Sequence, residues 1–326
     1  MESELVERAG YAFRRLDAPG FRRKLSPELV TNAYKINRAA KRAGAWLDEF
    51  KPDVGIGFGG AVTFPVIRTA KARGVPVVIQ EQNVVPGMAN RYLGRLADAI
   101  AIAGPAAKKG WPKSKRLVVT GNPIRLDRLT TDRGEARREL ELPETGRVVT
   151  IFGGSQGARH LNNEAVRAYA ALAGPQTAIL HLTGARDFGD IVNAWSAAGA
   201  NPHVKMLPYL DDMGLAYRAS DLVICRAGAS TLAELAAYGV PAVLIPYPYA
   251  ANDHQTKNAA VAVNAGAAAV LPDAELTAAS LSALVGELLS DSQKLTDMAK
   301  AAVAAGYPDA ATKLANLVIE LANKVE

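Results

Sequence analysis

Short apolar runs, each ending in glycine or polar turn residues and each followed by a helical pattern, recur along most of this chain. In the first part of the sequence they fall at residues 54–57, 75–80 and 99–103. Strands that alternate with helices in this way form parallel sheets covered by helices. After a break, the alternation resumes at residues 148–152, 177–182, 204–207, 222–225, 242–245 and 268–271. The pattern predicts an α/β fold made of two doubly wound, Rossmann-like halves.

The break, at residues 120–145, is typical of a connection between domains, because glycine, asparagine and proline are followed there by a charged tail. We therefore expect a first domain at residues 1–125 and a second at residues 126–303. A helix at residues 304–326 follows a glycine–proline break and is expected to pack back on the first domain. The first domain opens with a charged segment in place of an apolar strand and a tight glycine turn, so we expect it to be incomplete.

A basic segment near the N-terminus holds much of the charge. Residues 18–42 contain seven Lys or Arg residues against Glu28 alone, and the whole chain has a net charge of +6. Ser26 and Pro27 are typical of a helix start, and apolar residues then recur at spacings of three and four up to Phe50. The basic face of this helix is either simply solvated or lies on an anionic membrane surface, with equal weight for the two. Nucleic acid is not expected as a partner, because no binding motif accompanies the charge.

The sequence predicts neither a membrane span nor a secretory signal. Polar residues interrupt every apolar run before the roughly 18 residues that cross a bilayer, and the N-terminus lacks a basic region followed by an apolar stretch. Cys225 is the only cysteine, which excludes a disulfide framework and a cysteine-based zinc site, and we expect it to be a core residue. The chain is expected to remain in the cytoplasm, with no cofactor and no metal.

The sequence Gly-Gly-Ser-Gln-Gly at residues 153–157 lies between a predicted strand and a predicted helix. Such a turn offers backbone N–H groups and a helix N-terminus to an anion, and its small residues allow close approach. A phosphate-bearing ligand is the natural occupant, and a purely structural turn is the alternative.

Two further strand-to-helix turns carry polar residues suited to a nucleotide sugar. Glu234, on the helix after residues 226–231, suits the vicinal hydroxyls of a ribose. Its alternative role is that of a first-turn acid interacting with the helix dipole. Gln255 and Asn258 are three residues apart at the next helix start, where their amides suit sugar hydroxyls unless they cap the turn. Together the three turns predict a nucleotide-sugar site in the second half.

These turns resemble the donor-site signatures of the MurG family of glycosyltransferases, at residues 153–158, at residues 226–231 with Glu234, and at residues 253–259. In the first half, residues 57–60, 81–87 and 121–125 resemble the family's other landmarks in the same order. The resemblance covers nearly the whole chain. It implies the GT-B fold, with two Rossmann-like domains, a cleft between them and no metal required at the diphosphate.

Position by position, the resemblance implies binding roles on both sides of that cleft. The donor-binding residues it implies are Arg125, Ser155, Gln156, Leu210, Ala229, Ser230, Thr231, Leu232, Ala233, Glu234 and Gln255. Among them, the Leu210 backbone would receive uracil and Gln255 would meet the sugar hydroxyls. Asn83, Gly59 and Gly60 would face the acceptor. The catalytic residue is unknown; Glu81 is a candidate, with a buried structural carboxylate as the alternative.

The family's activity is inverting transfer of N-acetylglucosamine from UDP-N-acetylglucosamine to the C4 hydroxyl of undecaprenyl-diphosphate-N-acetylmuramoyl-pentapeptide. This step converts lipid I to lipid II in peptidoglycan synthesis and implies a peripheral enzyme at the cytoplasmic face of the cell membrane. Family members begin with a strand and a histidine-bearing glycine loop that have no counterpart here, and Ala61 stands where relatives commonly carry an aromatic residue. We therefore expect poor activity from the chain as written. The alternatives are a catalytically silent UDP-sugar-binding module, a glycolipid synthase and a UDP-sugar epimerase.

Overall fold

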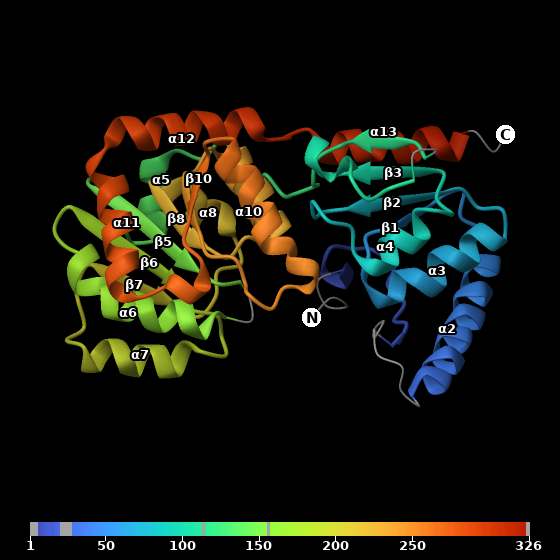
Figure 1. Ribbon diagram of the computed structural model, residues 1–326, viewed down its shortest axis with the longest axis horizontal. Coiled ribbons are helices and arrows are strands. Elements are labelled where there is room, and N and C mark those ends of the chain that lie inside the picture. The colour runs from blue at the N-terminus through green and yellow to red at the C-terminus, as the bar shows by residue number, and fades with distance from the viewer. Residues whose placement is uncertain (1–5, 20–27, 113–114, 155–156, 324–326) are drawn as a thin grey trace. The chain divides into compact units, whose positions relative to one another are not determined.

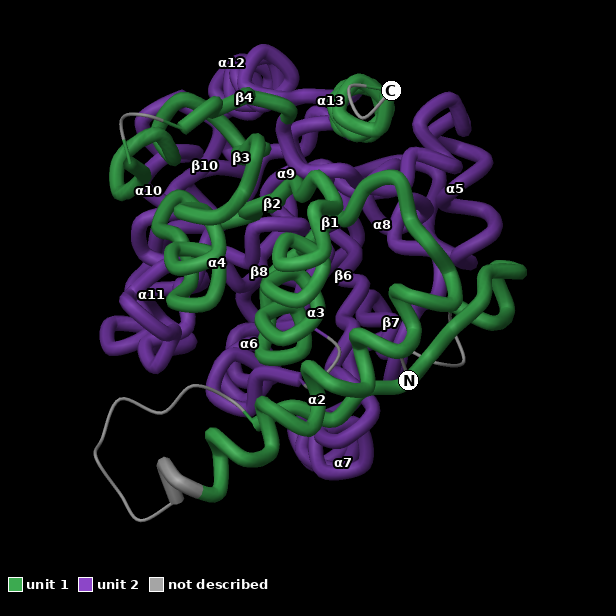
Figure 2. The backbone as a smooth tube through the Cα atoms, turned by 90° about the vertical axis from the view of Figure 1, so that its right-hand side faces the viewer, with its two compact units in different colours: residues 1–120, 311–326 green, residues 121–310 purple. Residues whose placement is uncertain are grey.

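The computed structural model describes residues 6–19, 28–112, 115–154 and 157–323, which form two α/β units (Figure 1). Unit 1 comprises residues 1–120 and 311–326, and unit 2 comprises residues 121–310 (Figure 2). The division after residue 120 comes slightly earlier than expected, because the next residues pack within unit 2. A Cβ added at Gly121 would lie 2.3 Å from the Cβ of Tyr307.

Unit 1 contains a parallel sheet of four strands in the order β1-β2-β3-β4. The strands are β1 (Gly55–Gly57), β2 (Val77–Glu81), β3 (Ala99–Ile102) and β4 (Leu117–Val119). Strand β4 was not predicted, because it has only three residues and no regular helical pattern follows it. Alternate residues of β2 point to opposite faces, so that Ile79 and Val78 enter different apolar clusters.

Helices cover both faces of this sheet. Helices α3 (Gly60–Ala72) and α4 (Met88–Leu93) lie on one face, together with the 3-10 turn η1 (Pro105–Lys108). Helix α13 (Ala310–Ala322) lies on the other face, where Leu314, Leu317 and Leu321 are buried (Figure 1). The last helix of the chain is thus part of the core of unit 1.

Helix α2 (Glu28–Phe50) packs against α3 rather than directly on the sheet. Its closest face consists of small residues, since Ala39 and Ala43 are buried with Val66 of α3. Ile36 and Leu47, two larger apolar residues of the predicted face, pack against the apolar cluster between α3 and the sheet, whereas Phe50, which was expected to face inward, is 77% exposed. The predicted helix start at Ser26 and Pro27 lies outside the described residues.

Unit 2 contains a parallel sheet of six strands in the order β10-β9-β8-β5-β6-β7. The strands are β5 (Arg147–Phe152), β6 (Thr177–Leu182), β7 (Val204–Leu207), β8 (Leu222–Cys225), β9 (Ala242–Leu244) and β10 (Ala268–Val270). The chain winds outward from β5 to β7 and then from β8 to β10, so the direction of winding reverses between β5 and β8. This is the strand order of a doubly wound dinucleotide-binding fold.

Two apolar clusters lie on opposite faces of the unit 2 sheet. One face carries α6 (Arg159–Leu172), α7 (Phe188–Ala197), α11 (Ala278–Ser290) and α12 (Ser292–Ala305). The other carries α5 (Arg133–Glu139), α8 (Met213–Ala219), α9 (Ala229–Tyr238) and α10 (His254–Asn264). The 3-10 turns η2 (Ala251–Asp253) and η3 (Asp273–Glu275) follow β9 and β10. Cys225 is buried in the second cluster, as expected.

Helix α5 lies within residues 120–145, which the sequence predicted to be a connection between domains without indicating this helix. The Asp132 side chain caps this helix by accepting hydrogen bonds from the backbone N–H groups of Gly134 at 2.8 Å and Glu135 at 3.3 Å. Arg137, which is 3% exposed, anchors the helix through an ion pair with Asp221 at 2.8 Å. The signal in the sequence was an aspartate followed three residues later by a glutamate.

Candidate functional site

The carboxyl ends of β5 and β8 meet where the winding of the unit 2 sheet reverses. Their last residues, Phe152 and Cys225, are direct partners in the parallel register. Open α/β sheets bind ligands in the crevice at this point, because the neighbouring loops turn to opposite faces. The two small-residue turns singled out in the sequence follow these two strands, so the structure brings them together.

The turn after β5 depends on glycine at several positions. Gly154 and Gly157 have φ values of 95° and 75°, in the left-handed region that side chains rarely adopt. A Cβ at Gly153 would lie 2.1 Å from the Cβ of Ala158, and one at Gly157 would lie 2.5 Å from Oδ2 of Asp187. The backbone therefore approaches its surroundings too closely for larger residues. Ser155 and Gln156, which were expected to bind the donor, lie outside the described residues.

The turn after β8 leads into the N-terminus of α9, a helix of ten residues. Gly228 is the N-cap residue, and it provides no side chain to cap the first N–H groups. Those groups and the positive end of the helix dipole form a site suited to an anion. Ala229, Ser230, Thr231, Leu232 and Ala233, all expected to bind the donor, form the first part of this helix.

Gln255 joins two of the turns rather than standing free. Its Oε1 atom accepts hydrogen bonds from the backbone N–H groups of Ala227 at 3.2 Å and Tyr247 at 2.9 Å. Because both partners are donors, the amide oxygen must face them, which leaves the Nε2 group to serve as a donor elsewhere. Asn258 is 3% exposed and donates to the Ala227 carbonyl at 3.3 Å. The expectation that Asn258 presents its amide to a sugar is wrong, because that amide is buried and hydrogen-bonded to the turn after β8.

Glu234 is half-buried on α9, and its Oε2 atom accepts a hydrogen bond from the Tyr217 hydroxyl at 2.6 Å. Burial raises the pKa of Glu234 above its ordinary value, and the hydrogen bond from Tyr217 only partly opposes that rise. The alternative role as a first-turn acid is wrong, since the first turn of α9 contains no acidic residue. Nothing in the sequence pointed to Tyr217 as its partner.

The two remaining described donor candidates lie on loops. Arg125 is 85% exposed and forms an ion pair with Asp127 at 2.9 Å, a contact that a ligand can replace at little cost. Leu210 lies between β7 and α8, and its side chain packs against the apolar cluster on the α8 face. That packing holds the backbone of Leu210 near the carboxyl edge of the sheet.

In unit 1, Glu81 ends β2 and is 1% exposed. Oε1 accepts hydrogen bonds from the backbone and side-chain nitrogens of Asn83 at 3.0 and 3.1 Å. Oε2 accepts from the Gly87 backbone at 3.0 Å and from Asn90 Nδ2 at 2.9 Å. With both oxygens occupied, this carboxylate organises the loop after β2, which is the structural alternative stated for it.

Gly59 and Gly60, which were expected to face the acceptor, stand at the start of α3. Gly59 and Gly60 have φ values of 92° and 81°, so both adopt a conformation that favours glycine. A Cβ at Gly59 would lie 3.2 Å from Nδ2 of Asn90, which places this turn against the loop that Glu81 organises. Gly59, Gly60 and Asn83 thus belong to one connected region of unit 1.

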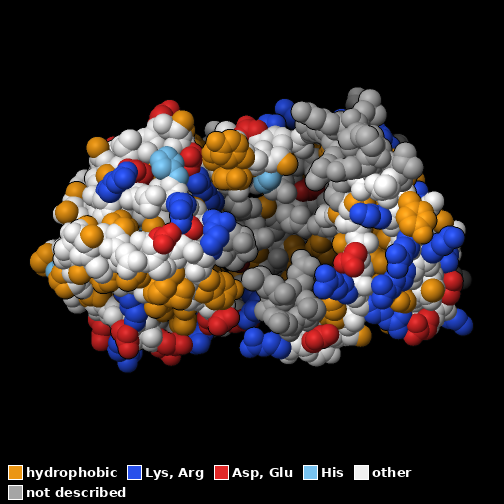
Figure 3. Space-filling view, turned by 90° about the horizontal axis from the view of Figure 1, so that it is seen from below, with side chains coloured by type: hydrophobic (Ala, Val, Ile, Leu, Met, Phe, Trp, Pro, Cys, Tyr) orange, Lys and Arg blue, Asp and Glu red, His pale blue; other side chains and the backbone are white. Residues whose placement is uncertain are grey.

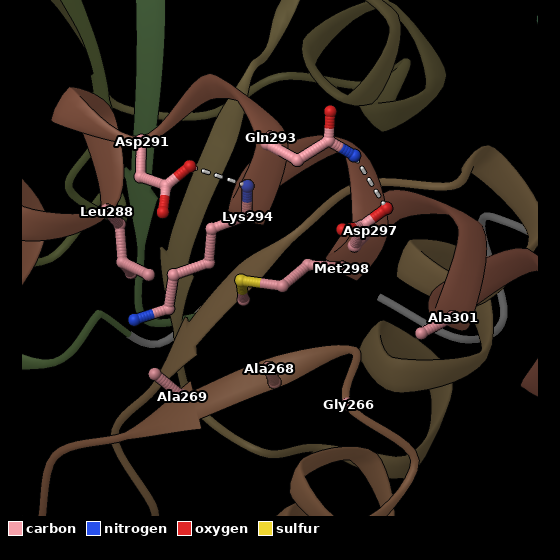
Figure 4. Close-up of a pocket in the computed structure, with 10 residues that line it drawn as sticks. All are labelled: Gly266, Ala268, Ala269, Leu288, Asp291, Gln293, Lys294, Asp297, Met298 and Ala301. Atoms are coloured by element: carbon pink, nitrogen blue, oxygen red, sulfur yellow. Dashed lines mark hydrogen bonds between the residues drawn. The ribbon is translucent and has the colours of Figure 1, made fainter.

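A cavity of about 610 Å³ lies elsewhere in unit 2, beside the first residues of β10 and the start of α12 (Figure 4). Asp291 and Asp297 stand at its rim, where they accept hydrogen bonds from the Lys294 backbone at 2.9 Å and from Gln293 at 3.0 Å. Its position at the amino end of β10 separates it from the carboxyl ends where the turns meet. None of the residues predicted for the donor site lines it.

The described part of the chain offers no group of three or more His, Cys, Asp or Glu side chains able to hold a metal ion. It also contains no helix long and apolar enough to cross a bilayer. Basic side chains gather on unit 1 over α2 (Figure 3). The described members of this group, all exposed, are Lys35, Arg38, Lys41 and Arg42. Arg22, Arg23 and Lys24 lie outside the described residues.

Comparison with known proteins gives matches along the whole chain. The model of the glycosyltransferase family 28 C-terminal domain matches residues 148–314, and the model of the N-terminal domain matches residues 1–102. A protein of Halothermothrix orenii is 39% identical over 99% of this chain and 89% of its own length. It is named UDP-N-acetylglucosamine–N-acetylmuramyl-(pentapeptide) pyrophosphoryl-undecaprenol N-acetylglucosamine transferase. A protein of the same name from Desulforudis audaxviator is 38% identical, with 99% and 88% of the two chains covered.

Solved structures agree with these matches. The crystal structure of Acinetobacter baumannii MurG superimposes with a TM-score of 0.77 at 33% identity, covering 98% of this chain and 88% of that one. UDP-GlcNAc 2-epimerase from Neisseria meningitidis, solved with UDP-GlcNAc bound, has a TM-score of 0.64 at 14% identity, with coverage of 91% and 83%. At that identity the second likeness concerns the fold alone.

Proposed function

The chain belongs to the MurG family of glycosyltransferases, within glycosyltransferase family 28, and we propose that it performs that family's transfer reaction. The donor is UDP-N-acetylglucosamine, and the acceptor is the C4 hydroxyl of undecaprenyl-diphosphate-N-acetylmuramoyl-pentapeptide. The observation that carries the proposal is the meeting of the two turns at the carboxyl ends of β5 and β8. The fold is GT-B, as expected from the sequence.

In the proposed reaction the acceptor oxygen attacks C1 of N-acetylglucosamine, and the bond from C1 to the diphosphate breaks with inversion. Negative charge then grows on the departing UDP. We expect the N–H groups at the start of α9, which no side chain caps, and the glycine turn after β5 to stabilise that charge. The proton of the acceptor hydroxyl requires a base, and Glu81 is not our candidate, because both its oxygens already accept hydrogen bonds.

The donor contacts proposed for single residues follow from their positions. Ala229 to Ala233 would bind the diphosphate through the helix N-terminus, and Glu234 would accept hydrogen bonds from the ribose hydroxyls. Gln255 would donate to the sugar through Nε2, since its oxygen is already used. Arg125 would exchange Asp127 for a phosphate oxygen. In unit 1, Asn83, Gly59 and Gly60 would contact the acceptor.

The exposed basic side chains of α2 support the proposal that unit 1 lies on an anionic membrane surface, where a lipid-linked acceptor is found. Flotation with vesicles containing anionic lipid should recover the protein, and added salt should weaken the binding. Replacing Lys35, Arg38, Lys41 and Arg42 by Gln should reduce recovery. Equal recovery with neutral vesicles, or with the substituted protein, would contradict this.

The transfer itself is tested with labelled UDP-N-acetylglucosamine and a lipid I analogue. A labelled product that requires the acceptor supports the proposal. UDP binding without any product supports a silent binding module instead. Conversion of the labelled donor in the absence of acceptor would indicate an epimerase.

A further inference from the structure

An ion pair of low exposure, extended by the exposed His160, links elements proposed to form the donor site of unit 2. Asp273, in η3 after β10, has a side chain that is only 16% exposed. Its Oδ1 atom lies 2.5 Å from Nη1 of Arg226, and its Oδ2 atom lies 3.0 Å from Nδ1 of His160. Arg226 begins the turn after β8, whereas His160 lies in the first turn of α6, directly after the glycine turn.

Arg226 extends the connection to the neighbouring strand. Its side chain is 12% exposed, and Nη1 also donates to the carbonyls of Ile245 at 3.1 Å and Pro246 at 3.4 Å. Its guanidinium carbon lies 5.7 Å from the centre of the Tyr247 ring. Contacts of Arg226 and Asp273 therefore join the start of α6 to the segments that follow β8, β9 and β10.

The chemistry of the cluster favours an ionised carboxylate. Burial raises the pKa of Asp273, but the hydrogen bonds from Arg226 and His160 outweigh this effect and lower it below its ordinary value. Hydrogen bonds between charged groups are about twice as strong as neutral ones. These contacts bridge η3, the turn after β8 and the start of α6 within the protein itself.

We propose that Asp273 is a positioning residue for the donor, because it holds the start of α6 and the turn before α9 in the relation that one diphosphate requires. This inference rests on the proposed function. Without Asp273, the N–H groups at the start of α6 and those at the start of α9 would no longer face the same diphosphate. Binding of the donor and binding of the departing UDP would then weaken alike, which raises the KM for the donor more than it lowers kcat. A purely structural ion pair would change stability without this split.

The test compares UDP binding by calorimetry with the steady-state kinetics of the transfer. Asp273→Asn keeps the size of the side chain and removes its charge. We expect its Kd for UDP and its KM for the donor to rise about tenfold, which corresponds to about 1.4 kcal/mol, with little change in kcat. Asp273→Glu restores the charge and should recover part of the loss. An unchanged Kd for UDP in the Asn variant would overturn the inference.

Asp221 provides a matched control at the opposite end of the same sheet. It is a buried carboxylate paired with Arg137 and Arg133, both at 2.8 Å, and it precedes β8. Asp221→Asn should lower the melting temperature and leave the Kd for UDP unchanged. If Asp221→Asn weakens UDP binding as much as Asp273→Asn does, the effect is general destabilisation and the inference fails.

His160→Ala gives a second route that does not depend on a buried substitution, because His160 is 45% exposed. It should weaken UDP binding by itself and have no further effect once Asp273 is Asn. Additive effects of the two substitutions would contradict the linkage. A wild-type protein that binds no UDP would instead refute the proposed function, so the two failures are distinguishable.

Discussion

At the scale of single residues, burial decides what a carboxylate can do. Glu234 and Glu81 are both acids beside predicted binding turns, yet their surroundings differ. Glu234 has one hydrogen-bond donor, the Tyr217 hydroxyl, and a pKa raised mainly by burial. Glu81 has four donors around its two oxygens. The first is available to a ligand, whereas the second is already committed to its own loop.

Glu234→Gln tests the raised pKa. Because the folded state favours the protonated acid, the stability contributed by Glu234 is complete below the unfolded pKa of about 4.5 and is lost as the pH rises through the folded value. Gln cannot ionise and still accepts from Tyr217. Urea unfolding from pH 4 to 8 should therefore show the variant gaining stability relative to wild type as the pH rises. Parallel curves would mean that the pKa is not raised.

Glu81→Gln tests the structural role of that carboxylate. An amide NH2 group cannot accept the hydrogen bonds that one carboxylate oxygen now accepts, so donors are left unsatisfied in a buried loop. We expect the free energy of unfolding to fall by about 2 kcal/mol. The measurement is chemical denaturation, with Gln82→Ala in the same loop as a milder comparison. Wild-type stability combined with lost transfer would instead indicate a catalytic role for Glu81.

At the scale of elements, the turn between β5 and α6 combines a local sequence requirement with tertiary contacts. Gly154 needs glycine because of its own φ value and has open space around it. Gly153 and Gly157 need glycine because Ala158 and Asp187 lie too close for a side chain. The turn is therefore held by both its backbone conformation and its neighbours.

Gly157→Ala should displace the turn, since the new methyl group would lie 2.5 Å from Asp187 Oδ2 at a φ of 75°. We expect UDP affinity to fall more than tenfold, or about 1.4 kcal/mol and above, as measured by calorimetry. Gly189→Ala is the control, because Gly189 lies within α7 with nothing near its Cβ position. That change should stabilise the protein by about 0.4–1 kcal/mol. Unchanged affinity in Gly157→Ala would show that the turn tolerates displacement.

At the scale of the whole molecule, the chain returns to its first unit after completing its second. Leu317 of α13 is 4% exposed and packs with Val78 and Ala99 of the unit 1 sheet. This face of the sheet is covered by a helix more than 200 residues away in the sequence. An ion pair between Arg116 and Glu320, which are 204 positions apart, links the same helix to the sheet's β3–β4 connection. Burial of this face of the unit 1 sheet therefore requires α13.

Leu317→Ala should lower the stability of unit 1 by about 2–5 kcal/mol, the usual cost of removing a buried leucine side chain. Hydrogen exchange should show faster opening of β2 and β3, whereas the strands of unit 2 keep their protection and their response to UDP. Ile319→Ala on the same helix is the control, because Ile319 is 55% exposed. Equal loss of protection in both units would show that they unfold as one.

The fold class, most strands and the turns proposed for the donor site could be predicted from the sequence alone. The predicted limits of β6, β7 and β8 agree with the structure, because each is an apolar run bounded by turn residues and its periodicity is local. The family motifs could also be recognised, because each is a contiguous stretch of sequence. Helix α5 and strand β4 were missed, since both are short, with seven and three residues.

Which polar groups already have hydrogen-bond partners becomes visible only in the folded chain. The sequence left both a binding and a structural role open for the Glu81 carboxylate and for the Gln255 and Asn258 amides, and the structure shows each of them bonded to the backbone of a turn. The cluster around Asp273 was invisible for the same reason, because its members are separated by 47 and 113 positions. Hydrogen-bond partners depend on which groups lie close together in the folded chain. Periodicity along the sequence does not reveal such contacts.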